Sequence, residues 1–130
     1  MSTSKHASGA KWEQVVQVYL KDAGWQILDT NYRSPFGELD IVALEPTTSD
    51  PVIVFVEVRS RRGSLYGAPI ESITAKKRAR ILATAYQWLS EHAEGTAEPA
   101  IRFDVAAVTV DCDGKAEITL YRGAFDATGV

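Results

Sequence analysis

The sequence predicts an α/β domain in which helices cover both faces of one mixed sheet. Two segments have helical periodicity and five have the composition of strands, and each helical segment is followed by a group of strands. A chain of 130 residues has the length of one domain and can bury a core without disulfides or structural metals. We expect residues 1–9 to form a mobile tail and residues 10–126 to form the domain.

Both helical segments show apolar residues at steps of three and four. The first spans residues 11–23 and is followed by Gly24, which can adopt the left-handed conformation that ends a helix. The second spans residues 73–92, with Ser72 or Thr74 as a candidate N-cap. Its expected buried stripe consists of Ala75, Ala79, Leu82, Ala85, Tyr86 and Leu89.

The segments with strand character are residues 25–33, 37–45, 52–59, 101–110 and 116–121. Residues 52–56 are all apolar, which is typical of a central strand that is covered on both faces. The segment 116–121 is weaker and is expected at an edge of the sheet. The predicted order is therefore a helix, three strands, a helix and two strands.

Composition argues against several classes of protein. Cys112 is the single cysteine, so the sequence holds neither a disulfide framework nor a thiolate zinc site. No stretch approaches the roughly 20 apolar residues of a membrane span. Residues 1–11 lack the apolar block of a signal peptide. We expect a cytoplasmic protein that does not bind membranes.

Charge is distributed unevenly along the chain. The formal net charge is -3, but residues 59–80 hold seven basic residues and one acidic residue, so this segment carries +6 and the remainder carries -9. A local positive field on an acidic body suits an anionic ligand such as nucleic acid. The alternative is that these residues simply decorate a solvated helix face.

Two acidic residues lie where a strand is expected to be apolar. Asp40 interrupts the segment 37–45, and Glu57 follows five consecutive apolar residues. Burying an unpaired carboxylate is costly, so such groups normally have a partner or bind a metal. If a hairpin pairs residue 45 with residue 52, Asp40 lies directly opposite Glu57, with Cβ atoms about 5 Å apart.

This pair of acids has two interpretations. Opposed carboxylates repel each other, and a divalent cation between them removes the penalty; ligation by carboxylates alone favours Mg²⁺ or Mn²⁺. Arg59 lies on the same strand face as Glu57 and adds a permanent positive charge. In the alternative, Arg59 or Arg33 forms an ion pair with one of the acids, and no metal binds.

The segments around these acids resemble known families. An acid, a turn and Glu-Val-Arg at the end of a hydrophobic strand resemble the PD-(D/E)xK motif of the restriction-endonuclease-like nuclease superfamily. The chain from about Gly9 to Phe125 is similar to the YraN-like family of uncharacterised bacterial proteins. The similarity is carried by GWQILDTNYR, FGELDIVA, VFVEVRSRR, the helix around Lys77, and RFDVAAV. It implies a restriction-endonuclease-like three-layer sandwich with an αβββαβ core and a mixed central sheet.

The resemblance also implies roles for individual residues. Asp40 and Glu57 match the metal-binding acids of the superfamily, and the backbone carbonyl of Val58 is a usual additional ligand. Glu13 matches a first-helix glutamate that approaches the metal directly or through water. Lys77 matches a lysine at the start of the long helix that can contact phosphate. From the residues alone, Glu13 and Lys77 can equally be solvated side chains.

Two residues depart from the family pattern. Arg59 stands where the superfamily has lysine, and Trp12 stands where the family usually has glycine. Arginine stays protonated at any working pH, so it cannot take a proton from water, although it can hold a phosphate. Trp12 leaves the helix intact but can crowd the approach to Glu13.

The expected function is Mg²⁺- or Mn²⁺-dependent hydrolysis of phosphodiester bonds in structured or branched DNA, because wider relatives of the family include archaeal Holliday-junction resolvases. Asp40, Glu57, Arg59 and Glu13 are the candidate catalytic residues. Tyr66 is a candidate for base stacking. A basic set would contact the nucleic-acid backbone: Arg61, Arg62, Lys76, Lys77 and Arg80.

Two other functions stay open at this stage. One is a nucleic-acid-binding module that has the fold but no turnover. The other is a protein-interaction subunit whose basic face meets an acidic partner. A homodimer is also open, since resolvase-like relatives pair to address two strands.

Overall fold

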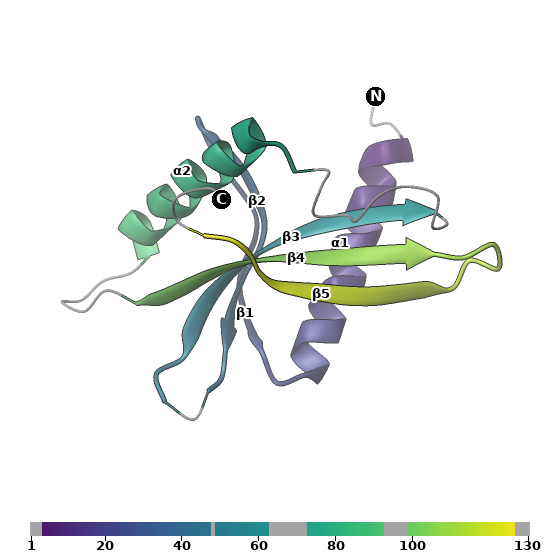
Figure 1. Ribbon diagram of the computed structural model, residues 1–130, viewed down its shortest axis with the longest axis horizontal. Helices are drawn as coiled ribbons and strands as arrows, with labels where there is room; N and C mark the ends of the chain where they lie inside the picture. Colours follow the sequence, from purple (N-terminus) through teal and green to yellow (C-terminus); the bar gives the residue numbers. More distant parts are fainter. Residues whose placement is uncertain (1–3, 48, 63–72, 93–98, 127–130) are drawn as a thin grey trace.

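The computed structural model of the protein describes residues 4–47, 49–62, 73–92 and 99–126. The elements follow the predicted order of a helix, three strands, a helix and two strands (Figure 1). They are α1 (Ser4–Asp22), β1 (Gln26–Ser34), β2 (Gly37–Glu45), β3 (Val52–Arg62), α2 (Ala75–His92), β4 (Ala100–Val110) and β5 (Ala116–Phe125).

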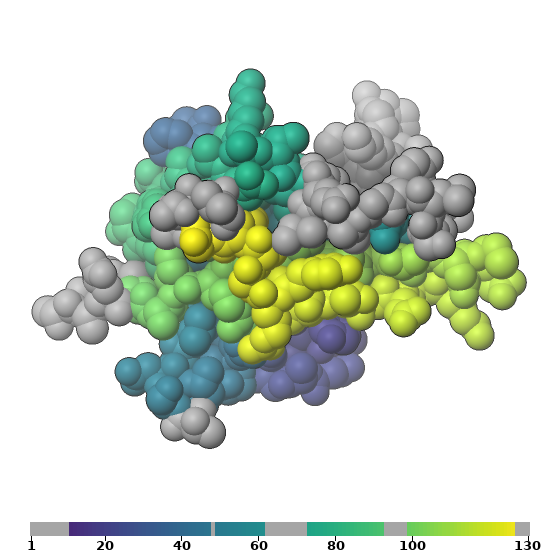
Figure 2. Space-filling view, viewed as in Figure 1, coloured from purple at the N-terminus to yellow at the C-terminus, as the bar shows by residue number. Residues whose placement is uncertain are grey.

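The five strands form one sheet in the order β1-β2-β3-β4-β5. β3 and β4 are parallel, and the other neighbouring pairs are antiparallel, so the sheet is mixed as predicted. β3 occupies the centre, in agreement with its apolar run. β5 is an edge strand, and its yellow atoms run across the front of the molecule in Figure 2.

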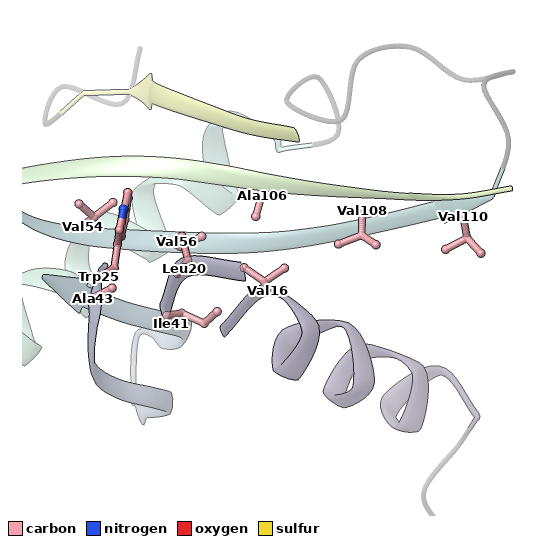
Figure 3. Close-up of a cluster of buried hydrophobic side chains, with 10 residues drawn as sticks. All are labelled: Val16, Leu20, Trp25, Ile41, Ala43, Val54, Val56, Ala106, Val108 and Val110. Atoms are coloured by element: carbon pink, nitrogen blue, oxygen red, sulfur yellow. The ribbon is translucent and has the colours of Figure 1, made fainter. Parts of the chain in front are cut away.

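The two helices cover opposite faces of this sheet. Val16 and Leu20 of α1 pack in one cluster with Val54 and Val56 of β3 (Figure 3). β4 contributes Ala106, Val108 and Val110 to the same cluster. On the other face, a second cluster brings three residues of α2 together with Phe55 of β3 and Phe103 of β4; the three are Ile81, Ala85 and Trp88. The alternation of side chains along β3 thus separates two cores, and the architecture has three layers.

The buried stripe of α2 differs from the prediction. Ile81, Thr84, Ala85 and Trp88 are buried, whereas Tyr86 is 50% exposed. Thr84 was overlooked because it is polar. Its Oγ1 hydroxyl donates a hydrogen bond to the carbonyl of Arg80 (2.7 Å), so it can be buried without an unsatisfied donor.

The first helix is longer than predicted, because α1 begins at Ser4, inside the segment expected to be a tail. Residues 4–10 contain no proline but no apolar stripe either, so hydrophobic periodicity could not indicate them. Among the described residues, neither helix is long and apolar enough to cross a membrane.

Candidate metal and nucleic-acid site at the fork of β2 and β3

β2 and β3 pair only over part of their length. The register runs from Glu45 opposite Val52 to Ile41 opposite Val56, as predicted for this hairpin. The next position in the same register places Asp40 opposite Glu57. Beyond it the strands continue without pairing, β2 back to Gly37 and β3 on to the end of its range. The two acids therefore lie where the two strands separate.

Asp40 spans this fork. Its Oδ2 accepts a hydrogen bond from the backbone N–H of Val58 (2.8 Å), beyond the last paired position of β3. Leu39 packs in the core beside α2, although Ile41 packs in the core beside α1. The strict alternation of β2 is therefore broken at Asp40, which gives this carboxyl group access to groups from both layers.

The carboxyl groups of Asp40 and Glu57 lie close enough for each to shift the pKa of the other. Desolvation by burial raises the pKa of both groups, and the charge of Asp40 raises the pKa of Glu57 further. Glu57 is only 9% exposed, and Asp40 is half-buried. The pair is therefore a dyad of desolvated, interacting carboxyl groups.

Two cations act on Glu57. The Nζ atom of Lys77 lies 3.8 Å from Glu57 Oε1, and its charge lowers the pKa of Glu57 and of Asp40. Arg59 also lowers the pKa of Glu57 by its charge. Its Nε atom is buried and has no hydrogen-bond partner among the described residues. Lys77 thus lies beside the acids. In the alternative interpretation Arg59 forms an ion pair with one of them, but Arg59 Nε donates no hydrogen bond to Glu57.

Glu13 of α1 also reaches the site. The charge of Asp40 helps to raise its pKa, after burial as the largest cause, and together these bring the pKa of Glu13 to about 7. Its Oε1 atom is buried without a hydrogen-bond partner. Trp12 is half-buried against the core of α1 and does not prevent this approach.

Asn31 is a member of the site that sequence reasoning missed. It lies between the pairs Thr30–Ile41 and Tyr32–Leu39, so the β1–β2 register places it opposite Asp40. Its side chain interacts with Glu13 and lowers the pKa of that carboxyl group, against the larger effect of burial. Asn31 has φ +52°, the left-handed conformation that asparagine tolerates better than most residues. An asparagine in a strand segment was the available signal.

The two acids open onto a cavity of about 480 Å³ between the fork and the start of α2. Thr74 caps this helix by accepting a hydrogen bond from the N–H of Lys77 on its Oγ1 (3.1 Å). Acidic side chains of β2 and β3 line one part of the cavity, and Lys76, Lys77 and Arg80 of α2 form its basic wall. The cavity is lined by Gly37, Glu38, Asp40, Glu57, Thr74, Lys76, Lys77, Arg80 and Ile81.

The predicted basic residues divide into two groups. Lys76, Lys77 and Arg80 line the cavity. Arg61 and Arg62 belong to the end of β3; Arg61 is not among the described lining residues, and the side chain of Arg62 lies outside the described part of the chain. Tyr66, the expected stacking residue, lies outside the described residues. Arg33 pairs with the exposed Glu38 (3.4 Å) rather than with either buried acid.

The donor set suits a hard divalent ion. Asp40 and Glu57 offer carboxylate oxygens, and Glu13 Oε1 is a buried acceptor that lacks a partner within the described part of the chain. In that same part, no three acidic, histidine or cysteine side chains are grouped closely enough to hold an ion by themselves. Mg²⁺ typically uses one or two carboxylates and keeps several waters, so this set fits it better than an ion that needs an all-protein cage.

Comparison with known proteins adds a family to this geometry. Residues 12–108 match the model of the family described as "Uncharacterised protein family UPF0102". The chain belongs to the UPF0102 family. This confirms the resemblance to YraN-like proteins at the level of the family. The matched region contains the site residues of α1, β1, β2, β3 and α2.

Individual UPF0102 proteins are similar over nearly the whole chain. A UPF0102 protein of Syntrophotalea carbinolica is 41% identical over 128 residues, which cover 98% of each chain. One from Rhodococcus opacus is 40% identical over 119 residues, 92% of this chain and 96% of the relative. One from Anaeromyxobacter sp. strain Fw109-5 is 39% identical over 125 residues, 96% of this chain and 89% of the relative.

Proposed function

We propose that this protein is a metal-dependent nuclease that hydrolyses phosphodiester bonds in DNA, with the fold and site of the restriction-endonuclease-like PD-(D/E)xK superfamily. The observation that carries the proposal is the buried dyad of Asp40 and Glu57 at the fork of β2 and β3, beside a cavity with a basic wall. Two desolvated carboxyl groups side by side disfavour the doubly charged state of the dyad, and a divalent cation bound between them makes that state favourable.

The ion would be held by the carboxylates of Asp40 and Glu57 and by the carbonyl of Val58. Glu13 would act through a water molecule, which would use its orphaned Oε1. When bound, Mg²⁺ or Mn²⁺ supplies Lewis-acid activation of water and neutralises charge on the phosphate. This chain's own residues bind the substrate and orient it.

In the proposed reaction, water attacks the phosphorus, one bridging P–O bond breaks, and the products are a phosphomonoester and an alcohol. The cations on α2 would hold the phosphate, since Lys76, Lys77 and Arg80 line the same cavity as the dyad. Lys77 is a titratable cation 3.8 Å from Glu57, whereas Arg59 cannot release its proton. In the PD-(D/E)xK motif a lysine stands at the position of Arg59. We assign the role of that lysine, a contact with the reacting phosphate, to Lys77.

A cleavage panel tests this proposal. Single-stranded, duplex, flapped and four-way-junction DNAs are incubated with the protein and with Mg²⁺, Mn²⁺ or EDTA. We expect cleavage only with a metal, and loss of all cleavage in Asp40→Asn. Asp22→Asn, which changes an exposed carboxylate at the end of α1, is the matched control and should cleave normally.

Two further variants separate the roles of the basic residues. Lys77→Ala should lower the single-turnover cleavage rate by about 100-fold, the usual loss when one charge-stabilising donor is removed. Arg59→Lys should retain cleavage. If the protein binds these DNAs with a steep salt dependence but cuts none of them, it is a binding module. If it binds no nucleic acid at low salt, the nuclease proposal is wrong and the protein-interaction subunit is the better description.

A further inference from the structure

The turn between β1 and β2 presents an aromatic side chain to solvent. Ser34 and Gly37 close the hairpin, and Phe36 at its tip is 52% exposed. The backbone N–H of Phe36 donates a hydrogen bond to Ser34 Oγ (3.1 Å), which fixes the turn. In Figure 2 the blue surface at the upper left, beside α2, belongs to this hairpin. The ring of Phe36 is therefore available for a contact with a ligand.

Phe36 adjoins the cavity of the proposed active site. The next two residues, Gly37 and Glu38, line that cavity. Gly37 also lies against α2, because a Cβ atom on it would be 3.6 Å from the Cβ of Arg80. Consecutive Cα atoms are about 3.8 Å apart, and stacked bases on one strand are about 3.4 Å apart. The Cα atom of Phe36 therefore lies about one such spacing from the Cα atom of Gly37, which lines the cavity.

The other exposed large hydrophobic side chains in the described part of the chain are placed differently. They are Val18, Tyr19, Leu28 and Tyr86. None of them is a direct chain neighbour of a residue that lines the cavity. Val18 and Tyr19 belong to α1, and Tyr86 lies six residues beyond Arg80 on α2. Among these described side chains, Phe36 is the exposed aromatic residue that directly precedes residues of the cavity with the basic wall of Lys76, Lys77 and Arg80.

We propose that Phe36 stacks on an unpaired base of the nucleic acid whose phosphate lies in the cavity. The substrate class is then DNA with unpaired bases at the cut site, such as a flap, a junction or a single strand, rather than an intact duplex. Every base has a face on which an aromatic ring can stack, so this contact selects unpaired structure without selecting sequence. The inference rests on the proposed nuclease function and adds its substrate class.

The test measures binding separately from cleavage. Fluorescence anisotropy with Asp40→Asn protein in EDTA gives the affinity for a labelled 20-nucleotide single strand, a flapped duplex and a blunt duplex. Adding Phe36→Ala should weaken binding of the first two by roughly 5- to 150-fold, the usual contribution of one stacked base. Binding of the blunt duplex should change less than twofold. Phe36→Trp should keep the affinity, because its ring also stacks.

Two controls separate stacking from charge and from loss of folding. Tyr86→Ala removes an aromatic ring of similar exposure (50%) from α2, away from the cavity lining, and should leave all affinities unchanged. Phe36→Ala should leave the slope of log affinity against log salt unchanged, since phenylalanine neutralises no phosphate. Arg80→Ala should reduce that slope by about one unit.

Three outcomes would overturn the inference. One is equal affinity of Phe36→Ala and the parent for single-stranded and flapped DNA. Another is an equal loss on the blunt duplex. The third is a change in oligomeric state on size-exclusion chromatography without a change in DNA affinity, which would make Phe36 a contact between protein chains. If the protein cleaves DNA but shows any of these, only the stacking role fails. If no DNA binds at all, the proposed function fails first.

Discussion

At the residue scale, the electrostatics of this site depend on two acidic side chains that the fold places close together. Asp40 and Glu57 are desolvated; the amide of Val58 donates a hydrogen bond to Asp40, and the ammonium group of Lys77 lies 3.8 Å from Glu57. Each of these partners favours one charge state of the dyad over another. The charge of the dyad, and so its affinity for a cation, therefore depends on pH.

The metal-free protein should lose stability as the pH rises from about 5 to about 8.5. Burial raises the pKa of Glu57 from 4.5 to about 8 and that of Glu13 from 4.5 to about 7. The folded state therefore binds more protons than the unfolded state in this window, so stability is complete below the unfolded pKa and is lost through the folded one. Urea unfolding in EDTA at several pH values measures this slope.

Glu57→Gln isolates the contribution of one carboxyl group. At pH 8.5 this variant should be more stable than the unchanged protein by about 1–3 kcal/mol, and at pH 5 the two should be nearly equal. Asp22→Asn, exposed and remote, should keep the original slope. A free energy of unfolding that rises between pH 5 and 8.5 in EDTA would contradict the raised pKa of these carboxyl groups. A dependence of that free energy on pH that Glu57→Gln does not reduce would contradict it for Glu57.

At the scale of elements, the site depends on how α2 sits on the start of β2. Gly37 begins β2, with φ +155°. A Cβ atom at this position would lie 3.3 Å from Thr84 Oγ1 and 3.6 Å from the Cβ of Arg80. The missing side chain therefore lets the helix approach the strand closely. That approach brings the basic residues of the first turns of α2 over the acids of the fork.

Gly37→Ala should destabilise the protein by about 1–2 kcal/mol, since the added methyl group presses on a buried hydroxyl and the backbone disfavours a side chain. Urea unfolding of Gly37→Ala, Thr84→Ala and the double variant forms a cycle. A coupling of about 0.5–1 kcal/mol in the direction of rescue would show that the contact with Thr84 causes the loss. Additive effects would place the cause in the backbone alone.

At the scale of the whole molecule, a second ionic cluster joins strands that are distant in the sequence. Arg102 binds Asp104 through two hydrogen bonds of 2.8 Å and Glu45 through one of 2.7 Å. Arg122 also pairs with Glu45 (2.5 Å), and the N–H of Gly123 donates to Asp104. This cluster ties the end of β2 to β4 and β5. It lies about 17 Å along β2 from Asp40, at the spacing of five strand residues.

Asp104→Ala should lower the free energy of unfolding by about 3–5 kcal/mol, because it leaves Arg102 partly buried without its main partner. Asp104→Asn keeps acceptors for Arg102 and Gly123 and should cost less. Denaturant midpoints measure both variants. At low temperature, where both are folded, the metal-dependent cleavage rate should match that of the unchanged protein. A loss below about 1 kcal/mol would mean that the cluster is not a structural tie.

Much of the architecture could be predicted because local patterns reflect burial directly. The all-apolar run from Val52 to Val56 has to lie in the middle of a sheet, and the structure places β3 there. The register of the hairpin was a hypothesis, since a slip by one residue would have placed the second acid on the opposite face of the sheet; the structure pairs Glu45 with Val52, as that hypothesis required. The buried stripe of α2 was predicted less well. Ile81 and Trp88 are buried although the predicted stripe did not include them, and three of its members are exposed: Ala75, Ala79 and Tyr86. Thr84 can be buried because its hydroxyl donates a hydrogen bond to Arg80.

The sequence by itself determined the order of the helices and strands, since each follows from residue spacing within one segment. It also predicted a mixed sheet, and it offered the opposition of Asp40 and Glu57 as a hypothesis on one hairpin register. Only the tertiary structure decided that Glu13 and Asn31 approach Asp40, that Lys77 lies beside Glu57, and that Phe36 is exposed at the cavity. These contacts join α1, β1 and α2 to the fork. Their distances depend on how whole layers pack, and no local periodicity encodes that packing.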